Sequence, residues 1–409
     1  MNRNVAVVGV GMNKHTSKRY EVNIPEMVYE AVKMAFDETG LTPRDVDAVV
    51  TGNMPGFEGV NTPEFWGAGY WGGYGKPVMR ITTGGTTGSS VAQGAYYMVA
   101  SGLCDTVLTL AFEKQSDGDT TMGLNSVALG DFASVVAYGA DIPTLSASLG
   151  GAIGLFVYQA AVYMQRSGCT VDHIDRAAAM LRANACKNRF AHLQQEGVTA
   201  ADIAATQMIS YPLRFGHTCP ASDGACAMLL TSEDRAAKLA GRPAWFKGCS
   251  SASEEATAFG LFGGGSINID PAEQRSCKLA ASRAYKLAGI TDPARQIDLA
   301  EPYIPFAHLL FIYFERLLLC GEGEAPRLFD EGVMEIGGAL PTCPSGAVMS
   351  TNAIGASAME RIAECALQIM GKAGEHQVPK EVHNAVAHGL GGAANLNVVT
   401  VLGDEPNRG

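Results

Sequence analysis

Apolar residues recur along the chain in two kinds of run. Short runs such as VAVVGVG near the N-terminus predict buried strands, and longer runs of small and apolar residues such as 91–100 predict buried helices. The two kinds of run alternate, which is typical of an α/β protein. We therefore expect mixed or parallel sheets with helices packed on their faces.

One helix–strand pattern occurs twice, at an offset of about 250 residues. In the first copy, residues 31–42 predict a helix that ends at a glycine, and a strand follows at 47–50. Residues 281–291 and 298–300 repeat this pattern in the same order. Ordered matches at a single offset indicate an internal duplication.

A glycine-rich turn that opens a helix also occurs in both copies. The first turn, ITTGGTTGSS, covers 81–90, and the second covers 345–355, before a helix predicted at about 356–370. We expect the two turns to face one cleft. The predicted organisation is therefore two similar α/β halves, 1–240 and 241–409.

The first copy also contains a long segment, about 115–235, for which we find no counterpart in the second copy. Apolar periodicity predicts helices within it at 154–166, 173–191 and 212–230. Residues 118–148 are rich in small side chains and are predicted to form a loop. We expect this inserted, largely helical region to act as a lid or a substrate pocket.

Composition argues against several classes of protein. Only 17% of the 409 residues are charged and the formal net charge is -11, which disfavours a nucleic-acid partner. No run of about 18 apolar residues occurs, so no membrane span is expected. The ten cysteines are scattered without a CxxC pair, so we expect neither a metal site nor a disulfide framework. Reduced thiols and an N-terminus without a signal-peptide pattern favour the cytoplasm.

Several motifs follow one another in the order found in the thiolase superfamily, which the chain resembles over nearly its whole length. They are the first glycine turn with its helix, 219–225 (CPASDGA), 301–307 (EPYIPFA), 344–346 with 352–356, 373–377 (AGEHQ) and 388–392 (HGLGG). The chain looks most similar to sterol-carrier-like thiolases, a group that includes benzoylsuccinyl-CoA thiolase and the steroid side-chain aldolases. The resemblance implies a five-layered thiolase fold, coenzyme A as part of the substrate, and no covalently bound cofactor.

The resemblance also implies that the family's nucleophile is missing. Thiolases attack the acyl-CoA with a cysteine at a helix N-terminus, where the helix dipole lowers the pKa of the thiol. Aligned on Gly88 and Ser89, this cysteine position falls on Gly85. The late acid–base cysteine of the family falls near Ala387, and the Gly-His-Pro motif has no histidine here. We infer that the covalent step is lost and that the turn still holds a thioester or enolate oxygen.

Tyr303 and His388 are the candidate groups for moving protons. Tyr303 stands where the family has the histidine or asparagine of a motif that holds an oxyanion water, and its phenol can donate to an enolate or accept a proton. His388 lies in a glycine-rich turn, and a neutral imidazole suits general acid–base work. For both residues the alternative is a packed side chain with a structural hydrogen bond.

Further candidates lie on the two turns. Asn352 either supplies an amide to an oxyanion hole or caps the following helix. Thr86, the hydroxyl nearest to the lost cysteine, is a hydrogen-bond donor, a helix cap or, least favoured, a nucleophile. The residues expected to bind the oxyanion or line the substrate pocket are Gly85, Gly88, Ser89, Gly355, Gly391 and Cys219.

Three functions stay open. The favoured one is CoA-dependent thiolysis of a bulky or aromatic 3-oxoacyl-CoA of the benzoylsuccinyl-CoA type, in which free CoA attacks the ketone directly. The second is a retro-aldolase that acts on a 3-hydroxyacyl-CoA, with Tyr303 taking the hydroxyl proton. The third is a scaffold that binds acyl-CoA without turnover.

The resemblance implies two protein partners, a second copy of the chain and a small OB-fold, zinc-ribbon subunit. An aromatic stretch at 65–74, which contains Trp66, Tyr70 and Trp71, agrees with a large apolar interface.

Overall fold

The computed structural model describes residues 3–54, 62–120, 152–254, 270, 272–392, 394 and 396–408. Within these ranges, nine strands form one mixed sheet in the order β3-β2-β4-β7-β1-β8-β11-β10-β9, and β5 pairs with β6 in a small separate sheet. The strands are β1 (Val5–Met12), β2 (Ala48–Gly52), β3 (Val78–Arg80), β4 (Thr106–Lys114), β5 (Met208–Ser210), β6 (Leu213–Arg214), β7 (Asp223–Ser232), β8 (Ala244–Ser253), β9 (Leu299–Glu301), β10 (Asn384–Gly391) and β11 (Leu396–Gly403).

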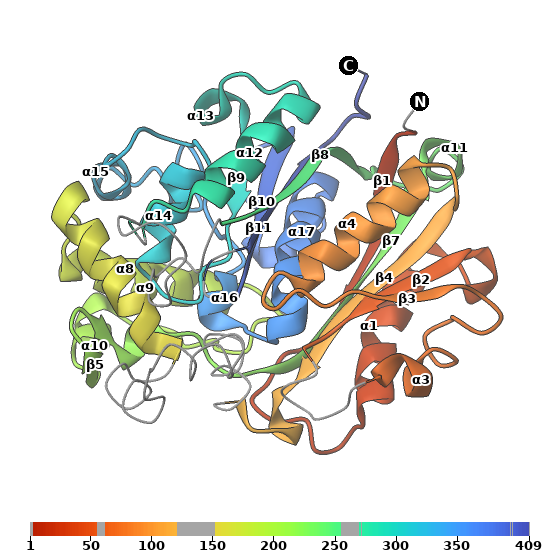
Figure 1. Ribbon diagram of the computed structural model, residues 1–409, viewed down its shortest axis with the longest axis horizontal. Coiled ribbons are helices and arrows are strands. Elements are labelled where there is room, and N and C mark those ends of the chain that lie inside the picture. The colour runs from red at the N-terminus through yellow and green to blue at the C-terminus, as the bar shows by residue number, and fades with distance from the viewer. Residues whose placement is uncertain are drawn as a thin grey trace, which may run out of the picture.

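Helices lie on both sides of the strands and between the two halves (Figure 1). They are α1 (Ile24–Thr39), α3 (Pro63–Gly67), α4 (Thr87–Ala100), α8 (Ala152–Ser167), α9 (Val171–Cys186), α10 (Ala200–Ala204), α11 (Glu233–Ala236), α12 (Arg275–Ala288), α13 (Pro293–Gln296), α14 (Leu309–Arg316), α15 (Ala325–Asp330), α16 (Ala347–Ser350) and α17 (Ile354–Met370).

The five layers predicted from the resemblance are present. Helix α4 packs on α17 in the centre, and one apolar cluster joins this pair to β2 and β4 on one side and to β10 and β11 on the other. Helix α1 covers the outer face of β1 and β7, and α12 covers the outer face of β8 and β11. The layers are therefore α1, the N-terminal strands, α4 with α17, the C-terminal strands and α12.

The order of the strands confirms the duplication. Reading outward from the β1–β8 pair, β7, β4 and β2 correspond to β11, β10 and β9, with the same antiparallel and parallel pairings. A parallel bridge between Ala300 and Thr342 stands where β3 pairs with β2 in the first half. Helices α1 and α12 both end at a left-handed glycine, Gly40 at φ 70° and Gly289 at φ 71°. The proposed boundary at 240/241 lies between α11 and β8 and stays a prediction.

The inserted segment differs from the expectation at its C-terminal end. Helices α8 and α9 confirm two predicted helices, but the helix predicted at 212–230 is wrong, because this stretch forms β6, a short turn and β7. All ten residues of β7 are buried, so its apolar run is continuous, and periodicity alone does not separate such a strand from a buried helix. Because β7 corresponds to β11, residues 223–232 belong to the duplicated unit. The loop predicted at 118–148 lies, beyond residue 120, outside the described residues.

The aromatic stretch predicted to line an interface divides into two parts. Trp71 is completely buried: its ring packs on Phe112 with 5.6 Å between centroids, and its Nε1 donates to the Pro25 carbonyl at 3.2 Å. The assignment of Trp71 to an interface is therefore wrong. Trp66 and Tyr70 are 71% and 68% exposed.

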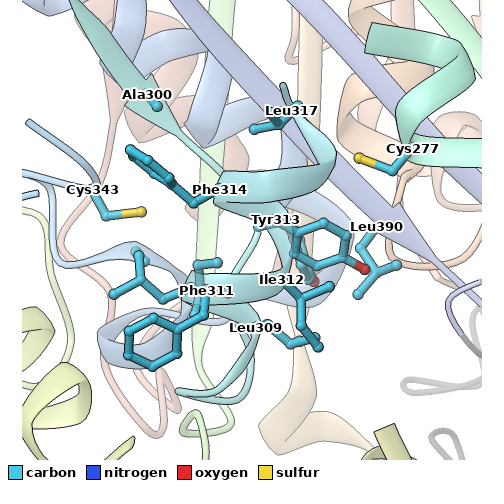
Figure 2. Close-up of a cluster of buried hydrophobic side chains, with 14 of the residues drawn as sticks. Cys277, Ala300, Leu309, Phe311, Ile312, Tyr313, Phe314, Leu317, Cys343 and Leu390 are labelled. Atoms are coloured by element: carbon cyan, nitrogen blue, oxygen red, sulfur yellow. The ribbon is translucent and has the colours of Figure 1, made fainter. Parts of the chain in front are cut away.

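A large apolar cluster joins the C-terminal half to helices α8 and α9 of the inserted segment. Figure 2 shows part of it, with Phe311, Ile312 and Phe314 of α14 among the labelled side chains. Each fully buried side chain of this size contributes about 1.5–3 kcal/mol by leaving water. Tyr303 and Leu390 belong to the same cluster, so the candidate site rests on a rigid base. None of the described helices is long and apolar enough to cross a membrane.

The two central helices approach each other closely at Gly88. A Cβ atom added at Gly88 would lie 2.4 Å from the Met359 backbone nitrogen and 3.0 Å from the Ala356 carbonyl oxygen. Beside it, the Ser89 hydroxyl donates to the Ala358 carbonyl at 3.0 Å. Gly88 and Ser89 therefore hold α4 against α17, and only a residue without a side chain fits at the first of these positions.

We expect Gly88→Ala to destabilise the protein by about 2–3 kcal/mol, because the new methyl group meets backbone atoms that cannot move independently. Gly94→Ala is the matched control on the same helix, since its Cβ would meet side-chain atoms and no backbone, Cδ1 of the flexible Ile81 at 2.5 Å and Cγ1 of Val50 at 3.9 Å. Thermal unfolding of both variants checks this. Equal melting temperatures for the two would contradict the close approach of α4 and α17.

Candidate active site

The N-terminus of α4 meets β10 and the end of β9 at Gly85. A Cβ atom added at Gly85 would lie 2.4 Å from the Leu390 carbonyl oxygen and 3.5 Å from the Tyr303 hydroxyl oxygen. The position to which the family's cysteine aligns is thus closed to any side chain by a backbone carbonyl. The Tyr303 hydroxyl thus lies at contact distance from the place where such a side chain would begin.

Thr86 lies beside Gly85 and is completely buried. Its hydroxyl donates to the Thr83 carbonyl at 2.6 Å and contacts the Thr83 hydroxyl at 3.0 Å. A Cβ atom at Gly391 would lie 2.5 Å from the Thr86 hydroxyl, so β10 passes directly over it. The Thr86 hydroxyl is therefore hydrogen-bonded within the turn and covered by β10. This geometry favours the reading of Thr86 as a turn-stabilising residue, and Gly391 as the position that lets β10 pass.

Tyr303 follows β9, and its side chain is 3% exposed. Burial raises the pKa of Tyr303 far above its usual range, and a hydrogen bond with the Ser357 side chain acts in the opposite direction. The phenol is consequently neutral at physiological pH. A neutral phenol both donates and accepts hydrogen bonds, which suits it to receive one proton while it gives another.

A buried ion pair fixes the strand end that carries Tyr303. Glu301 Oε2 lies 2.6 Å from Nη1 of Arg361 in the middle of α17, and it also accepts from the Ser345 hydroxyl at 2.9 Å. Burial alone would lower the pKa of Arg361, but the carboxylates of Glu301, Glu360 and Glu364 raise it above its usual range, so the guanidinium is charged. The glutamate of the EPY motif therefore has a structural contact that holds Tyr303 over the central helices.

His388 lies under Tyr303 with both ring nitrogens engaged by the protein. Its Nε2 contacts Asn397 Oδ1 at 2.7 Å, and its Nδ1 accepts from the Tyr303 backbone N–H at 3.4 Å. Burial lowers the pKa of His388 to about 4, so the ring is neutral. A ring without a free nitrogen is better suited to position the Tyr303 backbone than to exchange protons with a substrate.

Asn352 lies on the second glycine turn and is 7% exposed. Its Nδ2 lies 3.2 Å from Cys219 Sγ, and its Oδ1 accepts from the Ser357 hydroxyl at 3.2 Å. Ser357 in turn contacts Tyr303, so a chain of polar groups runs from Tyr303 through Ser357 and Asn352 to Cys219. Burial raises the pKa of Cys219 to about 11, so its thiol is neutral, although the side chain is partly exposed.

The buried carboxylate of Glu113 holds the second turn in place by hydrogen bonds. It accepts from the Gly355 backbone N–H at 3.0 Å and from the Met54 N–H at 3.0 Å. A Cβ atom at Gly355 would lie 2.7 Å from Glu113 Oε2 and 2.5 Å from the Phe112 carbonyl oxygen. The N–H of Gly355 is therefore occupied by the protein, and Gly355 serves the close packing of α17 against β4.

Eight of the ten predicted residues fall into two groups, and the other two, His388 and Thr86, are bonded to neighbouring protein groups as described above. Tyr303, Gly85, Asn352 and Cys219 come together around one site at the N-termini of α4 and α17. Gly88, Ser89, Gly355 and Gly391 lie at the packing contacts that shape this site. The sequence analysis missed Ser357, which links Tyr303 to Asn352, and Arg361. The charged residues Glu360, Arg361 and Glu364 inside an otherwise apolar helix were the available signal for a buried ion network.

In the part of the chain that the structure describes, no cluster of three or more His, Cys, Asp or Glu side chains could hold a metal ion. All ten cysteines carry free thiols.

Comparisons with known proteins agree with this fold. Residues 267–404 match the family described as "Thiolase C-terminal domain-like". The chain is 28% identical to 17-hydroxy-3-oxo-4-pregnene-20-carboxyl-CoA lyase of Mycobacterium tuberculosis, over 90% of this chain and 91% of that protein. It is 26% identical to the acetyl-CoA acetyltransferase of Methanocaldococcus jannaschii, over 98% of this chain and 100% of that protein.

Among solved structures, the Ltp2-ChsH2(DUF35) aldolase superposes with a TM-score of 0.83 and 25% identity, over 100% of this chain and 99% of that chain. The protein therefore has the thiolase fold and a thiolase-like, carbon–carbon bond-cleaving type of site. In sequence and fold the chain is similar to sterol-carrier-like thiolases and to a steroid-carboxyl-CoA lyase.

The geometry at Gly85 predicts that a cysteine restored there does not form an acyl-enzyme. In Gly85→Cys the new side chain would collide with the Leu390 carbonyl, so we expect a lower melting temperature and no added acyl mass after incubation with an acyl-CoA. Intact-protein mass spectrometry checks the second point. Stoichiometric acylation of the variant would show that the position still accepts the family's nucleophile.

Proposed function

We propose that the protein cleaves a 3-hydroxyacyl-CoA by a retro-aldol reaction, without a covalent intermediate. The observation that carries this proposal is the Tyr303 hydroxyl, 3.5 Å from the place where a side chain at Gly85 would begin. The fit to an aldolase structure supports the same assignment, as does the similarity to a carboxyl-CoA lyase. A phenol in place of a thiol suits proton transfer and does not suit acyl transfer.

The substrate and the Tyr303 phenol together account for every proton and bond in the proposed reaction. The proton of the substrate 3-hydroxyl moves to the Tyr303 oxygen as the bond between C2 and C3 breaks and C3 becomes a carbonyl. The proton that Tyr303 carried moves to C2, where the thioester enolate becomes a shorter acyl-CoA. Because the pKa of Tyr303 is far above its usual range, the neutral phenol is the form that takes part.

The two helix N-termini assist by stabilising the enolate. Negative charge on the thioester oxygen is favoured at the N-terminal end of a helix, and the Asn352 amide lies on the turn that opens α17. In this proposal His388 holds the backbone of Tyr303 in place, Thr86 stabilises the turn, and neither residue touches the substrate. The bound molecule is a CoA thioester, and coenzyme A is its only cofactor-like part.

CoA-dependent thiolysis of a 3-oxoacyl-CoA is the second candidate. The similarity to an acetyl-CoA acetyltransferase favours it, and the benzoylsuccinyl-CoA type of substrate belongs with it. In this reaction free CoA would attack the ketone directly, since residue 85 is a glycine and offers no thiol. Tyr303 would then pass its proton to C2 of the leaving enolate and take up the proton that the CoA thiol loses as its sulfur bonds to the ketone carbon.

We also propose two partners and a compartment. A small OB-fold, zinc-ribbon subunit is supported by the aldolase match, whose name contains a second component. A homodimer is supported by the exposed Phe65, Trp66, Tyr70 and Tyr74, which remain uncovered within the described chain. The free thiols favour a reducing compartment such as the cytoplasm.

Product analysis separates the two reactions. With the small partner present, we expect 3-hydroxyacyl-CoA esters to give a ketone or aldehyde and a shortened acyl-CoA without added free CoA. Mass spectrometry of the CoA esters measures this. Cleavage of 3-oxoacyl esters that depends strictly on free CoA would establish thiolysis in its place, and binding without any turnover would establish a scaffold.

Tyr303→Phe tests the residue that carries the proposal. We expect kcat to fall by about 10²–10⁴, the usual range for loss of a positioned proton-transfer group, with little change in the melting temperature. Tyr285→Phe is the matched control, since Tyr285 is equally buried and its hydroxyl donates only to the Leu317 carbonyl at 2.7 Å. Equal activity of the two variants would remove Tyr303 from the mechanism.

The pKa directions predict a flat pH profile. His388, with a pKa lowered to about 4, and Tyr303, with a pKa raised far above its usual range, are both neutral throughout pH 6–9. We therefore expect kcat/KM to change by less than about twofold across this window, as measured with the same substrate. A rising or falling limb with a midpoint near pH 7 would show that another group performs the proton transfer.

A further inference from the structure

A buried cation that has no counter-charge in the described part of the chain lies next to the candidate site. Arg182 of α9 is 5% exposed. Its Nη2 donates to the Thr218 carbonyl at 3.0 Å, and its Nη1 is buried without a hydrogen-bond partner among the described residues. A buried donor of this kind is rare, because the lost hydration of an unpaired guanidinium is costly unless another group compensates for it.

No carboxylate of the described residues forms an ion pair with Arg182. The contrast with Arg361 is clear, since Arg361 is equally buried and lies 2.6 Å from Glu301. Burial lowers the pKa of Arg182 only to about 10, so the guanidinium stays charged at neutral pH. The compensating anion is thus absent from the described protein, although the cation is present.

The position of Arg182 indicates where such an anion would come from. Thr218, which holds Nη2, directly precedes Cys219, and the charge of Arg182 acts on the Cys219 thiol. Cys219 Sγ lies 3.2 Å from Asn352 Nδ2, which connects through Ser357 to Tyr303. The Arg182 guanidinium therefore neighbours Cys219, whose side chain is partly exposed and begins the chain of polar groups that leads to Tyr303.

Two other sources of the anion, the Cys219 thiol and the CoA phosphates, fit less well. The Cys219 thiol is neutral, since burial raises its pKa to about 11. The CoA phosphates belong to the far end of the substrate, whereas Arg182 neighbours the residues that would contact the acyl group. An anion carried by the acyl group itself would lie on the same side of the substrate as Arg182.

We propose that Arg182 binds a carboxylate carried by the acyl group, so that the protein selects CoA thioesters of dicarboxylic acids. This proposal rests on the proposed function for the placement of the acyl group beside Tyr303 and Asn352. A guanidinium and a carboxylate form charge-assisted hydrogen bonds, and the buried position excludes the water that would compete for them.

Binding measurements test this without any turnover. The ligands are succinyl-CoA and glutaryl-CoA, each compared with the ester in which the free carboxylate is a primary amide, and free CoA. Isothermal titration calorimetry gives each Kd for the wild type, Arg182→Gln, Arg182→Lys and Arg176→Gln. Arg176 is the matched control on the same helix, because it is 37% exposed and already paired with Asp172 and Asp330.

For the wild type we expect at least one dicarboxylic ester to bind about 10–100-fold more tightly than its amide, the range of a charge-assisted hydrogen bond. Arg182→Gln should abolish this preference and leave the Kd of the amide and of free CoA within about threefold. Arg182→Lys should keep part of the preference, and Arg176→Gln all of it. Circular dichroism and melting temperature confirm that each variant is folded.

Two results would overturn the proposal. The first is equal affinity of the wild type for both acids and their amides. The second is an equal loss of affinity for all ligands, free CoA included, in Arg182→Gln, which would assign the guanidinium to a CoA phosphate. Failure of the retro-aldol proposal is separate, because it appears as absent cleavage of 3-hydroxyacyl esters whatever the binding preference.

Discussion

The ion pair between Glu301 and Arg361 is the contact on which the arrangement of the site depends. It joins the end of β9 to the middle of α17 at 2.6 Å, and Ser345 of the second turn donates to the same carboxylate. Removal of one member of such a buried pair typically costs about 3–5 kcal/mol, because the other charge stays buried alone. Tyr303 is two residues from Glu301, so this contact sets where the phenol meets the N-terminus of α4.

Close backbone contacts complete the site, and they explain why a glycine replaces the family's cysteine. Leu390 of β10 brings its carbonyl oxygen to 2.4 Å from the place of a Cβ at Gly85, and Gly391 lets the strand pass over Thr86. A chain with this backbone has no room for a thiol. The Leu390 carbonyl and the Tyr303 phenol occupy the space beside Gly85. We propose that this arrangement serves proton transfer to an enolate.

Much of the architecture followed from the sequence, because duplicated helix–strand patterns and glycine-terminated helices are local signals. The helix at 31–42 and its repeat at 281–291 appear as α1 and α12 with left-handed glycine caps. The strand β7 was read as a helix because both of its faces are buried, which removes the alternation that identifies a strand. Trp71 was placed at an interface because composition does not tell which aromatic residues point inward.

The candidate site was predictable only in part. Tyr303, Gly85 and Asn352 stood on recognisable motifs, and the structure brings them together. The hydrogen bonds of His388 to Asn397 on the neighbouring strand and to the Tyr303 backbone, 85 residues away in sequence, arise only in the folded chain. The same holds for Ser357, which matters because it bonds to Asn352. It also holds for Arg182, which matters because its Nη1 has no partner among the described residues.

The central claim is that carbon–carbon cleavage proceeds without an acyl-enzyme. The most direct measurement is intact-protein mass spectrometry of the wild type, quenched in acid during steady-state turnover of a substrate that it cleaves. The account predicts the unmodified mass at every time point, because Gly85 holds no thiol and Thr86 is shielded by β10. A species heavier by the mass of an acyl fragment, and localised to any cysteine or to Thr86, would contradict it.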